Sequence, residues 1–227
     1  ELCQYLNVPY ISLVSNGTVG LMTALQALDI RGEVITTPYT YAATSQSLLW
    51  NKIKPVFADI DPITLNLDPK KIESVITSDT SAIMPVHAYG NPCDVGAIED
   101  IAKKYKLKVV YDAAHAFGTE DEHGSILKYG DLSVISFHAT KVFNTFEGGA
   151  VVSTDSKLTD RINQIKNFGK VSETDMDQIG FNAKMNEFNS ALGILNLKYI
   201  TANIKKRETL DAAYREGLKN TLGIHCH

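Results

Sequence analysis

The sequence predicts an α/β fold in which a mostly parallel central sheet is covered by helices. Along most of the 227 residues, segments with helical spacing of apolar residues alternate with short apolar segments. Such alternation is typical of parallel strands joined by right-handed helical crossovers. Residues 107–114, 132–139 and 149–154 are continuously apolar rather than alternating, which suits strands that are buried on both faces.

The expected helices show apolar residues that recur with the helical period. They cover residues 18–28, 40–50, 68–76 and 95–106, and a long helix or helix pair covers residues 185–218. Two of the starts carry signals: Asn16 and Gly17 supply a cap and a turn before the first helix, and Pro69 stands just inside the third. The other expected strands cover residues 33–38, 54–60 and 81–87.

We expect this chain to contain one large domain and an appended helical part. Residues 1–184 form the large domain, and residues 185–227 form a helical segment that leads away from it. The first residue is not methionine, residues 1–10 resemble the end of a helix, and residues 221–227 stop soon after a helical pattern. We therefore expect both ends to be truncated.

Composition and charge disfavour several classes of function. The chain has 22 Lys and Arg and 26 Asp and Glu, a formal net charge of −4, and no basic block of the kind that neutralises nucleic-acid phosphates. No apolar stretch approaches the roughly 20 residues that span a bilayer, and no signal peptide opens the sequence. Cys3, Cys93 and Cys226 show no CxxC motif or metal-ligand spacing. We expect reduced thiols, no metal site and a cytoplasmic location.

Ligands of open α/β sheets bind beyond the carboxyl ends of the strands, and four groups of polar residues are expected there. The first is Asn16, Gly17, Thr18 and Val19, where the chain enters a helix. Free backbone N–H groups and the positive end of the helix dipole favour an anion at such a point, and Gly17 permits close approach of a phosphate. The alternative is a plain helix cap, because Asn and Thr are common caps.

The second group is Asp112 with His115, at the end of an apolar strand. A buried carboxylate needs a cationic or hydrogen-bonding partner, and a protonated pyridine nitrogen would serve. Equally, Asp112 could cap the following segment and His115 could be satisfied by the backbone.

The third group is Lys141 with Ser136, and the fourth is Tyr41. A lysine shielded from water has a lowered pKa, and its neutral amine can form a Schiff base with a carbonyl, whereas most lysines simply lie on the surface. The Ser136 hydroxyl could donate to a phosphate. Tyr41 follows a strand at the start of a helix, so its ring could stack on a planar ligand or pack in the core.

Five motifs in chain order carry a resemblance. They are SNGTVGLMTAL, TPYTYAAT, PVHAYGNPCD, VVYDAAHAFG and SFHATKVFNTFEGG. Together they resemble the DegT/DnrJ/EryC1/StrS family of nucleotide-sugar aminotransferases, which are fold type I enzymes dependent on pyridoxal 5′-phosphate (PLP). The resemblance extends from residue 1 through the motif GFNAKMNEFNSALGILNL.

The resemblance implies a role for each candidate residue. Lys141 matches the lysine that holds PLP through a Schiff base, Asp112 the aspartate that pairs with the ring nitrogen, and His115 a residue near the ring oxygen. The other matches are Gly17, Thr18 and Val19 in the phosphate-binding turn, Ser136 at the phosphate, Tyr41 over the ring, and Asn182 at the phosphate of a neighbouring subunit's cofactor.

The resemblance also implies an activity and an assembly. An amino group would move from glutamate to a keto group of a nucleotide-linked deoxy sugar, and the wording of residues 139–149 is closest to the branch that aminates C4 of dTDP-4-keto-6-deoxyglucose. Lysine rather than histidine at position 141 favours amination over dehydration. A homodimer with shared active sites and a small C-terminal domain, largely absent from this chain, are expected too. Two alternatives stay open: a fold type I PLP enzyme acting on amino acids, such as a lyase or desulfurase, and a non-catalytic sensor on the same scaffold.

Overall fold

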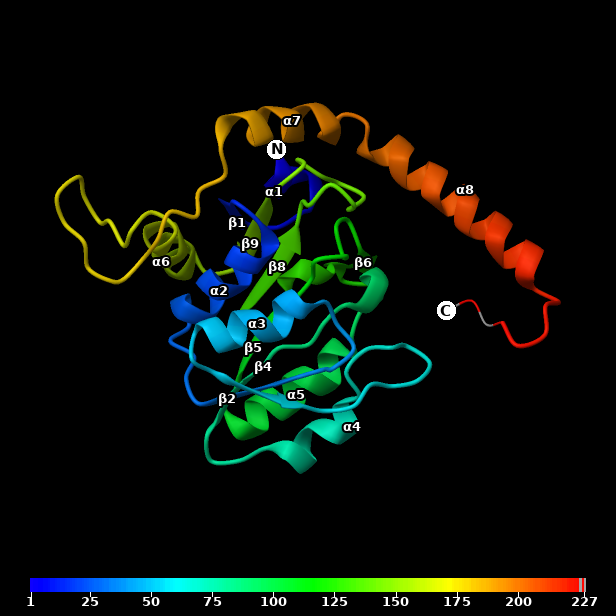
Figure 1. Ribbon diagram of the computed structural model, residues 1–227, viewed down its shortest axis with the longest axis horizontal. Coiled ribbons are helices and arrows are strands. Elements are labelled where there is room, and N and C mark those ends of the chain that lie inside the picture. The colour runs from blue at the N-terminus through cyan, green and yellow to red at the C-terminus, as the bar shows by residue number, and fades with distance from the viewer. Residues whose placement is uncertain (225, 227) are drawn as a thin grey trace.

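A computed structural model describes residues 1–224 and residue 226, and it is built around a seven-stranded sheet (Figure 1). The strand order is β1-β9-β8-β5-β4-β2-β3. The four pairs from β3 to β8 are parallel, whereas β9 runs antiparallel to both β8 and β1. The strands are β1 (Tyr10–Val14), β2 (Glu33–Thr36), β3 (Lys54–Phe57), β4 (Thr80–Ile83), β5 (Lys108–Asp112), β8 (Leu132–Ser136) and β9 (Gly149–Ser153), with a small separate hairpin of β6 (Glu120–Asp121) and β7 (Gly124–Ser125).

Helices connect most of these strands. They are α1 (Leu2–Tyr5), α2 (Gly17–Ala27), α3 (Ala42–Trp50), α4 (Pro69–Ile72), α5 (Val95–Tyr105), α6 (Ser156–Ile165), α7 (Glu187–Leu197) and α8 (Ile200–Leu218). Asn16 caps α2 by accepting a hydrogen bond from the Val19 N–H at 2.9 Å, and Asn186 caps α7 in the same way. The side-chain oxygens thereby satisfy N–H groups that a helix start leaves without intrahelical acceptors.

The sheet lies between two helical layers. On one face, α2, α3 and α6 pack on apolar side chains such as Val34, Val134 and Val151. On the other face, α4 and α5 cover the β2, β4 and β5 end, and α1 with the start of α8 covers the β1, β9 and β8 end. All five residues of β8 and of β9 are buried, as the continuous apolar segments predict.

The α/β class, the largely parallel sheet and the helix pair after residue 185 are confirmed. The helix expected over 68–76 is too long, because the α-helix ends at Ile72 and a 3-10 turn follows, where the Ser74 hydroxyl bonds the Lys71 carbonyl. The strand expected over 81–87 ends at Ile83, shortly before Pro85, which cannot donate a ladder hydrogen bond. Strand β1 and helix α6 have no counterpart among the predicted elements.

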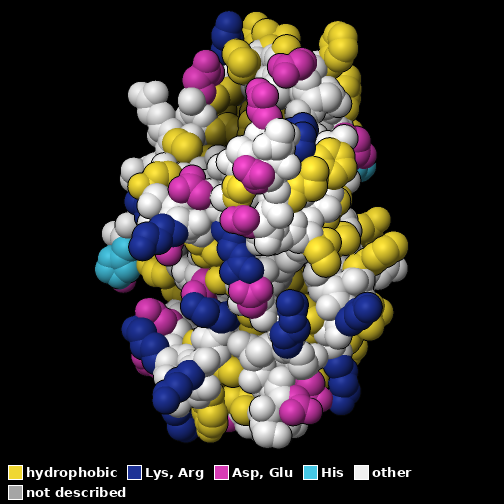
Figure 2. Space-filling model, turned by 90° about the vertical axis from the view of Figure 1, so that its left-hand side faces the viewer, with side chains coloured by type: hydrophobic (Ala, Val, Ile, Leu, Met, Phe, Trp, Pro, Cys, Tyr) yellow, Lys and Arg dark blue, Asp and Glu magenta, His cyan; other side chains and the backbone are white. Residues whose placement is uncertain are grey.

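The last two helices begin against the layered body, but most of α8 extends beyond it (Figure 1). Helix α7 crosses one end of the sheet beside the N-terminus, and α8 extends away from it (Figure 1). On the face drawn in Figure 2, Lys and Arg side chains are interspersed with Asp and Glu rather than gathered into a basic surface. Within residues 1–224 and residue 226, no helix has the length and apolarity that crossing a bilayer requires.

Candidate active site

Three backbone segments meet closely where α2 begins. A Cβ atom on Gly17 would lie 3.1 Å from the Cβ of Ser136, at the end of β8. A Cβ atom on Gly149, the first residue of β9, would lie 2.8 Å from the backbone of Asn16 and Gly17. The Val19 N–H already donates to Asn16, whereas the N–H groups of Gly17 and Thr18 have no acceptor among the described residues. Two free donors at a helix start, with the Ser136 hydroxyl next to them, form a cradle suited to a phosphate.

Gly149→Ala is expected to destabilise the protein by about 1–3 kcal/mol, the usual cost of overpacking a tight site. The added methyl group would meet backbone atoms on two sides, including the Ile135 carbonyl at 2.9 Å, and backbone cannot rotate away. The matched control is Gly217→Ala on α8, where no atom lies within 4 Å and alanine is the better helix former. Urea denaturation of both variants measures the difference, and equal stability of the two would contradict this account of the cradle.

Asp112 lies at the carboxyl end of β5 and is almost fully buried. Its Oδ2 accepts a hydrogen bond from Thr44 Oγ1 at 2.7 Å, and its Oδ1 accepts one from the Ala114 N–H at 3.1 Å. Burial nevertheless raises the pKa of this carboxyl group, and these hydrogen bonds, with smaller contributions from the nearby charges of His115 and Lys141, only partly offset that rise. The buried carboxylate therefore has a strong electrostatic preference for a cationic partner.

Lys141 is half-buried in the loop after β8, and desolvation lowers the pKa of its amine while Asp112 opposes that change. Its Nζ makes no hydrogen bond or ion pair with any described residue. The His115 ring lies close enough to interact with both charges: desolvation and Lys141 lower the pKa of His115, and Asp112 raises it. The structure thus brings Lys141, Asp112 and His115 together, although they come from two different strand ends.

The sequence allowed Tyr41 either to stack on a planar ligand or to pack in the core. Core packing is wrong, because Tyr41 is 79% exposed at the start of α3. Sequence reasoning missed two other tyrosines. The hydroxyls of Tyr39 and Tyr89 lie 2.8 Å apart, and the Tyr89 ring stacks on His115 with centroids 6.1 Å apart. Tyr89 adopts a φ of 54° just before Gly90, and no local sequence pattern predicts this strained backbone conformation.

The Asn182 side chain makes no hydrogen bond with the other candidates among the described residues. It is exposed, and the carbonyl of its neighbour Ala183 accepts a hydrogen bond from the Ser15 N–H at 2.8 Å, so this segment lies beside the turn that precedes α2. Thr44, which contacts Asp112 directly, was also missed by sequence reasoning. Its only signal is that it stands three residues after Tyr41, on the first turn of α3.

Comparison with known proteins adds the last observation. The sequence model of the DegT/DnrJ/EryC1/StrS aminotransferase family matches residues 1–227. A Shigella dysenteriae protein named dTDP-4-amino-4,6-dideoxy-D-glucose transaminase is 58% identical over 224 residues, which are 99% of this chain and 61% of that protein.

Two solved structures share the fold. DesI, determined in the presence of its TDP-sugar product, has a TM-score of 0.93 and 39% identity over 99% of this chain and 57% of its own. NtdA from Bacillus subtilis, with bound cofactor PMP, has a TM-score of 0.90 and 34% identity over 97% of this chain and 52% of its own. The chain spans about three fifths of the length of the curated relatives it matches.

Proposed function

We propose that this chain, which belongs to the DegT/DnrJ/EryC1/StrS aminotransferase family, forms the cofactor-binding part of a PLP-dependent aminotransferase. The chain has the fold type I architecture of that family. The enzyme transfers an amino group from glutamate to C4 of dTDP-4-keto-6-deoxyglucose, in the cytoplasm. The observation that supports this most strongly is the meeting of a half-buried Lys141, whose pKa is lowered, with the buried carboxylate of Asp112.

The residues present fit PLP at three separate points. The phosphate matches the cradle of Gly17, Thr18 and Ser136, which a side chain at position 17 would partly fill. The protonated ring nitrogen matches the buried carboxylate of Asp112, and the aldehyde matches the Lys141 amine. We assign the exposed Tyr41 to cover the ring, and we assign Val19 to the phosphate-binding turn because of its position, since its N–H already donates to Asn16.

The side chains then have distinct tasks. When bound, PLP supplies an aldehyde that exchanges amino groups and a ring that withdraws electrons from the reacting carbon. Lys141 would hold the cofactor through its neutral amine, and the same amine would serve as the general base that moves a proton. Asp112 would hold the proton on the ring nitrogen, and the Thr44 hydroxyl, which donates to Asp112, would keep the carboxylate in place for that task. His115 lies beside both charges and can donate to the ring oxygen.

The substrate class rests on the relatives. The names of the Shigella dysenteriae relative and of DesI, with its TDP-sugar product, both point to a thymidine-linked sugar. No described residue by itself distinguishes C3 from C4 amination. A lyase or desulfurase acting on amino acids remains the second candidate because Lys141 and Asp112 would serve that chemistry equally well.

The experiment that tests the function uses the complete protein in which this chain occurs. It is reconstituted with PLP and incubated with glutamate and dTDP-4-keto-6-deoxyglucose, and both 2-oxoglutarate and the amino sugar are measured. Both products are expected in equal amounts. Absence of both would reject the aminotransferase, and a protein that stays colourless with added PLP would also reject the lyase and leave the sensor.

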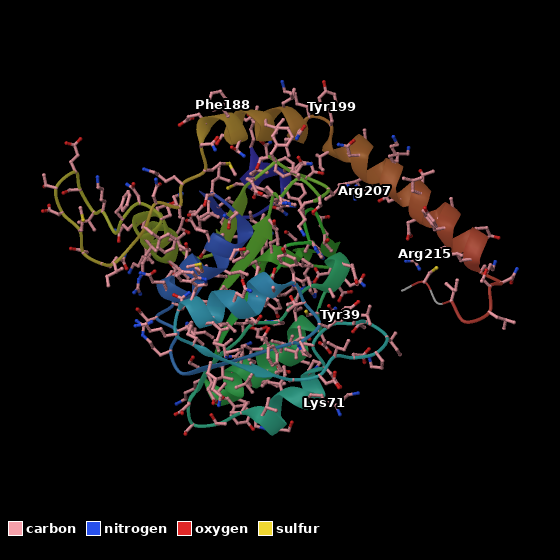
Figure 3. All side chains as sticks on the ribbon, in the orientation of Figure 1. Tyr39, Lys71, Phe188, Tyr199, Arg207 and Arg215 are labelled. Carbon is pink, nitrogen blue, oxygen red and sulfur yellow. The ribbon has the colours of Figure 1, made fainter. Side chains whose placement is uncertain are left out.

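We also propose a homodimer that shares its active sites. Phe188 at the start of α7 is 89% exposed, and Tyr199 at the junction with α8 is 58% exposed (Figure 3). Ile194 and Leu195 on α7 are exposed as well. An apolar surface of this kind is typical of an interface. In this proposal residues 1–184 form the large domain, residues 185–227 lead toward a smaller C-terminal domain, and Asn182 reaches the partner's phosphate.

Asn182→Ala is expected to weaken PLP retention, and mixing subunits tests whether Asn182 acts across the dimer. Lys141→Ala and Asn182→Ala variants are each expected to have little activity. Co-refolded in equal amounts, they should recover about a quarter of the wild-type activity, since half of the dimers are mixed and each mixed dimer holds one intact site. No recovery, or a monomer that retains PLP fully, would contradict the shared site.

A further inference from the structure

We propose that Asn189 and Asn196 of α7 are positioning residues that hold the loop carrying Lys141 in its reactive geometry. The loop comprises residues 137–148, between the end of β8 and the start of β9. The inference about Lys141 reactivity rests on the proposed function, whereas the inference about the loop itself does not.

Two amide groups hold three carbonyls of this loop. Asn189 Nδ2 lies 2.5 Å from the Thr145 carbonyl oxygen and 2.6 Å from that of Glu147. Asn196 Nδ2 lies 2.9 Å from the Asn144 carbonyl oxygen. These contacts join positions 42 to 52 residues apart in the sequence, so they fasten the loop to a separate helix rather than to itself.

One face of α7 contacts the loop of residues 137–148. Positions 189, 193 and 196 are spaced four and three apart, so they lie on one side of α7. Gly193, between the two asparagines, is buried, and a Cβ atom there would lie only 3.0 Å from Thr145 Cγ2. Glycine thus lets the loop approach closely enough for both amides to reach its carbonyls.

The loop is also held by the buried Phe143 ring and by hydrogen bonds within the loop, but among the described residues only the two amides donate to the carbonyls of residues 144 and 145. The Thr145 N–H donates to the Phe137 carbonyl at 2.9 Å, and Thr145 Oγ1 donates to the Glu147 carbonyl at 2.7 Å. Irregular backbone without ladder partners is mobile unless other groups satisfy its carbonyls. Since Lys141 lies on this loop, movement of residues 144–147 would move its amine relative to Asp112, and a loosely held catalytic group loses most of its effect.

The test replaces the amide donor without changing its size. In Asn189→Asp, an oxygen takes the place of the NH₂ group and faces two carbonyl oxygens, so the contacts become repulsive. The matched control is Asn203→Asp on α8, where the side chain is exposed and makes no hydrogen bond within the described part of the chain. Both changes add one negative charge.

Two measurements are made on the complete protein. The first is amide hydrogen exchange of peptides covering residues 137–148 without cofactor, where Asn189→Asp is expected to exchange about tenfold faster or more. The second is the rate at which borohydride traps PLP on Lys141, followed against pH. In Asn189→Asp the trapping rate is expected to fall several-fold and its pH midpoint to rise, because a loosened loop admits water to the amine. Asn203→Asp should match the wild type in both.

The outcomes separate the two proposals. If wild-type protein fails to trap PLP on Lys141, the proposed function fails, while the exchange data still test the loop. Asn196→Asp provides a second variant if Asn189→Asp also raises exchange in β5, which would signal general unfolding. Wild-type exchange of residues 137–148 in both asparagine variants overturns the inference, and so does faster exchange with an unchanged pH profile of trapping, because Lys141 would then not depend on the loop.

Discussion

Lys141→Ala is expected to abolish covalent capture of PLP and to lower transamination by at least about 10²- to 10⁴-fold, the range that one positioned acid–base group supplies. The variant lacks both the amine that bonds to the aldehyde and the base that moves the proton. Borohydride trapping followed by peptide mass measurement checks the first loss, and single-turnover product formation from glutamate checks the second.

The same variant is expected to stay folded. The Lys141 amine is half-buried without a hydrogen-bonding partner among the described residues, so its removal leaves no orphaned group. The free energy of unfolding should change by less than about 1 kcal/mol. Lys205→Ala on the exposed surface of α8 serves as the control for loss of a positive charge. Normal turnover in Lys141→Ala would exclude the proposed mechanism, whatever the stability.

The parts of the site that follow from local patterns could be predicted from the sequence. Asp112 and Ser136 end the apolar segments that become β5 and β8, and Asn16 stands where a helix start needs a cap. Each of these placements depends on a few neighbouring residues. The α/β class and the helix pair α7 and α8 depend on periodicities within single segments, so they too could be predicted.

The parts that depend on pairing between distant segments could not be predicted. Thr44 contacts Asp112 from 68 residues away, and Asn189 contacts Thr145 from 44 residues away. No local pattern marks either partner. The continuous apolar run of β9 indicates burial but not direction, so its antiparallel pairing with β8 and β1 has no signal in that run.

Asp112→Asn is expected to lower activity by about 10²- to 10³-fold, the cost of removing one preorganised electrostatic partner from an active site. The amide cannot hold a proton on the ring nitrogen of PLP. Without cofactor, however, the variant is expected to be more stable than the wild type at pH 7, because asparagine removes the cost of burying a charged carboxylate. Urea denaturation at several pH values, with and without PLP, measures this difference.

The direction of this stability difference, and its dependence on pH, follow from the burial of Asp112. Burial raises its pKa in the folded protein above the value near 4 of an unfolded chain. The protonated acid therefore favours folding below about pH 4, and this contribution is lost as the pH rises through the folded-state pKa. Asparagine is neutral at every pH. The greater stability of Asp112→Asn should therefore appear only above about pH 4 and should vanish as the pH falls toward 4. Asp160→Asn, at an exposed position on α6, should show no such advantage.

The local hydrogen bonds permit the substitution. The asparagine carbonyl can accept from the Ala114 N–H, and its NH₂ group can donate to Thr44 Oγ1, which lies 2.6 Å from Thr40 Oγ1 and can donate there instead. PLP should reverse the order of stability, because a ligand stabilises the form that binds it more tightly. If Asp112→Asn is instead less stable without cofactor at pH 7, then Lys141 and His115 already compensate the buried carboxylate, and its need for a cationic ring would lose its physical basis.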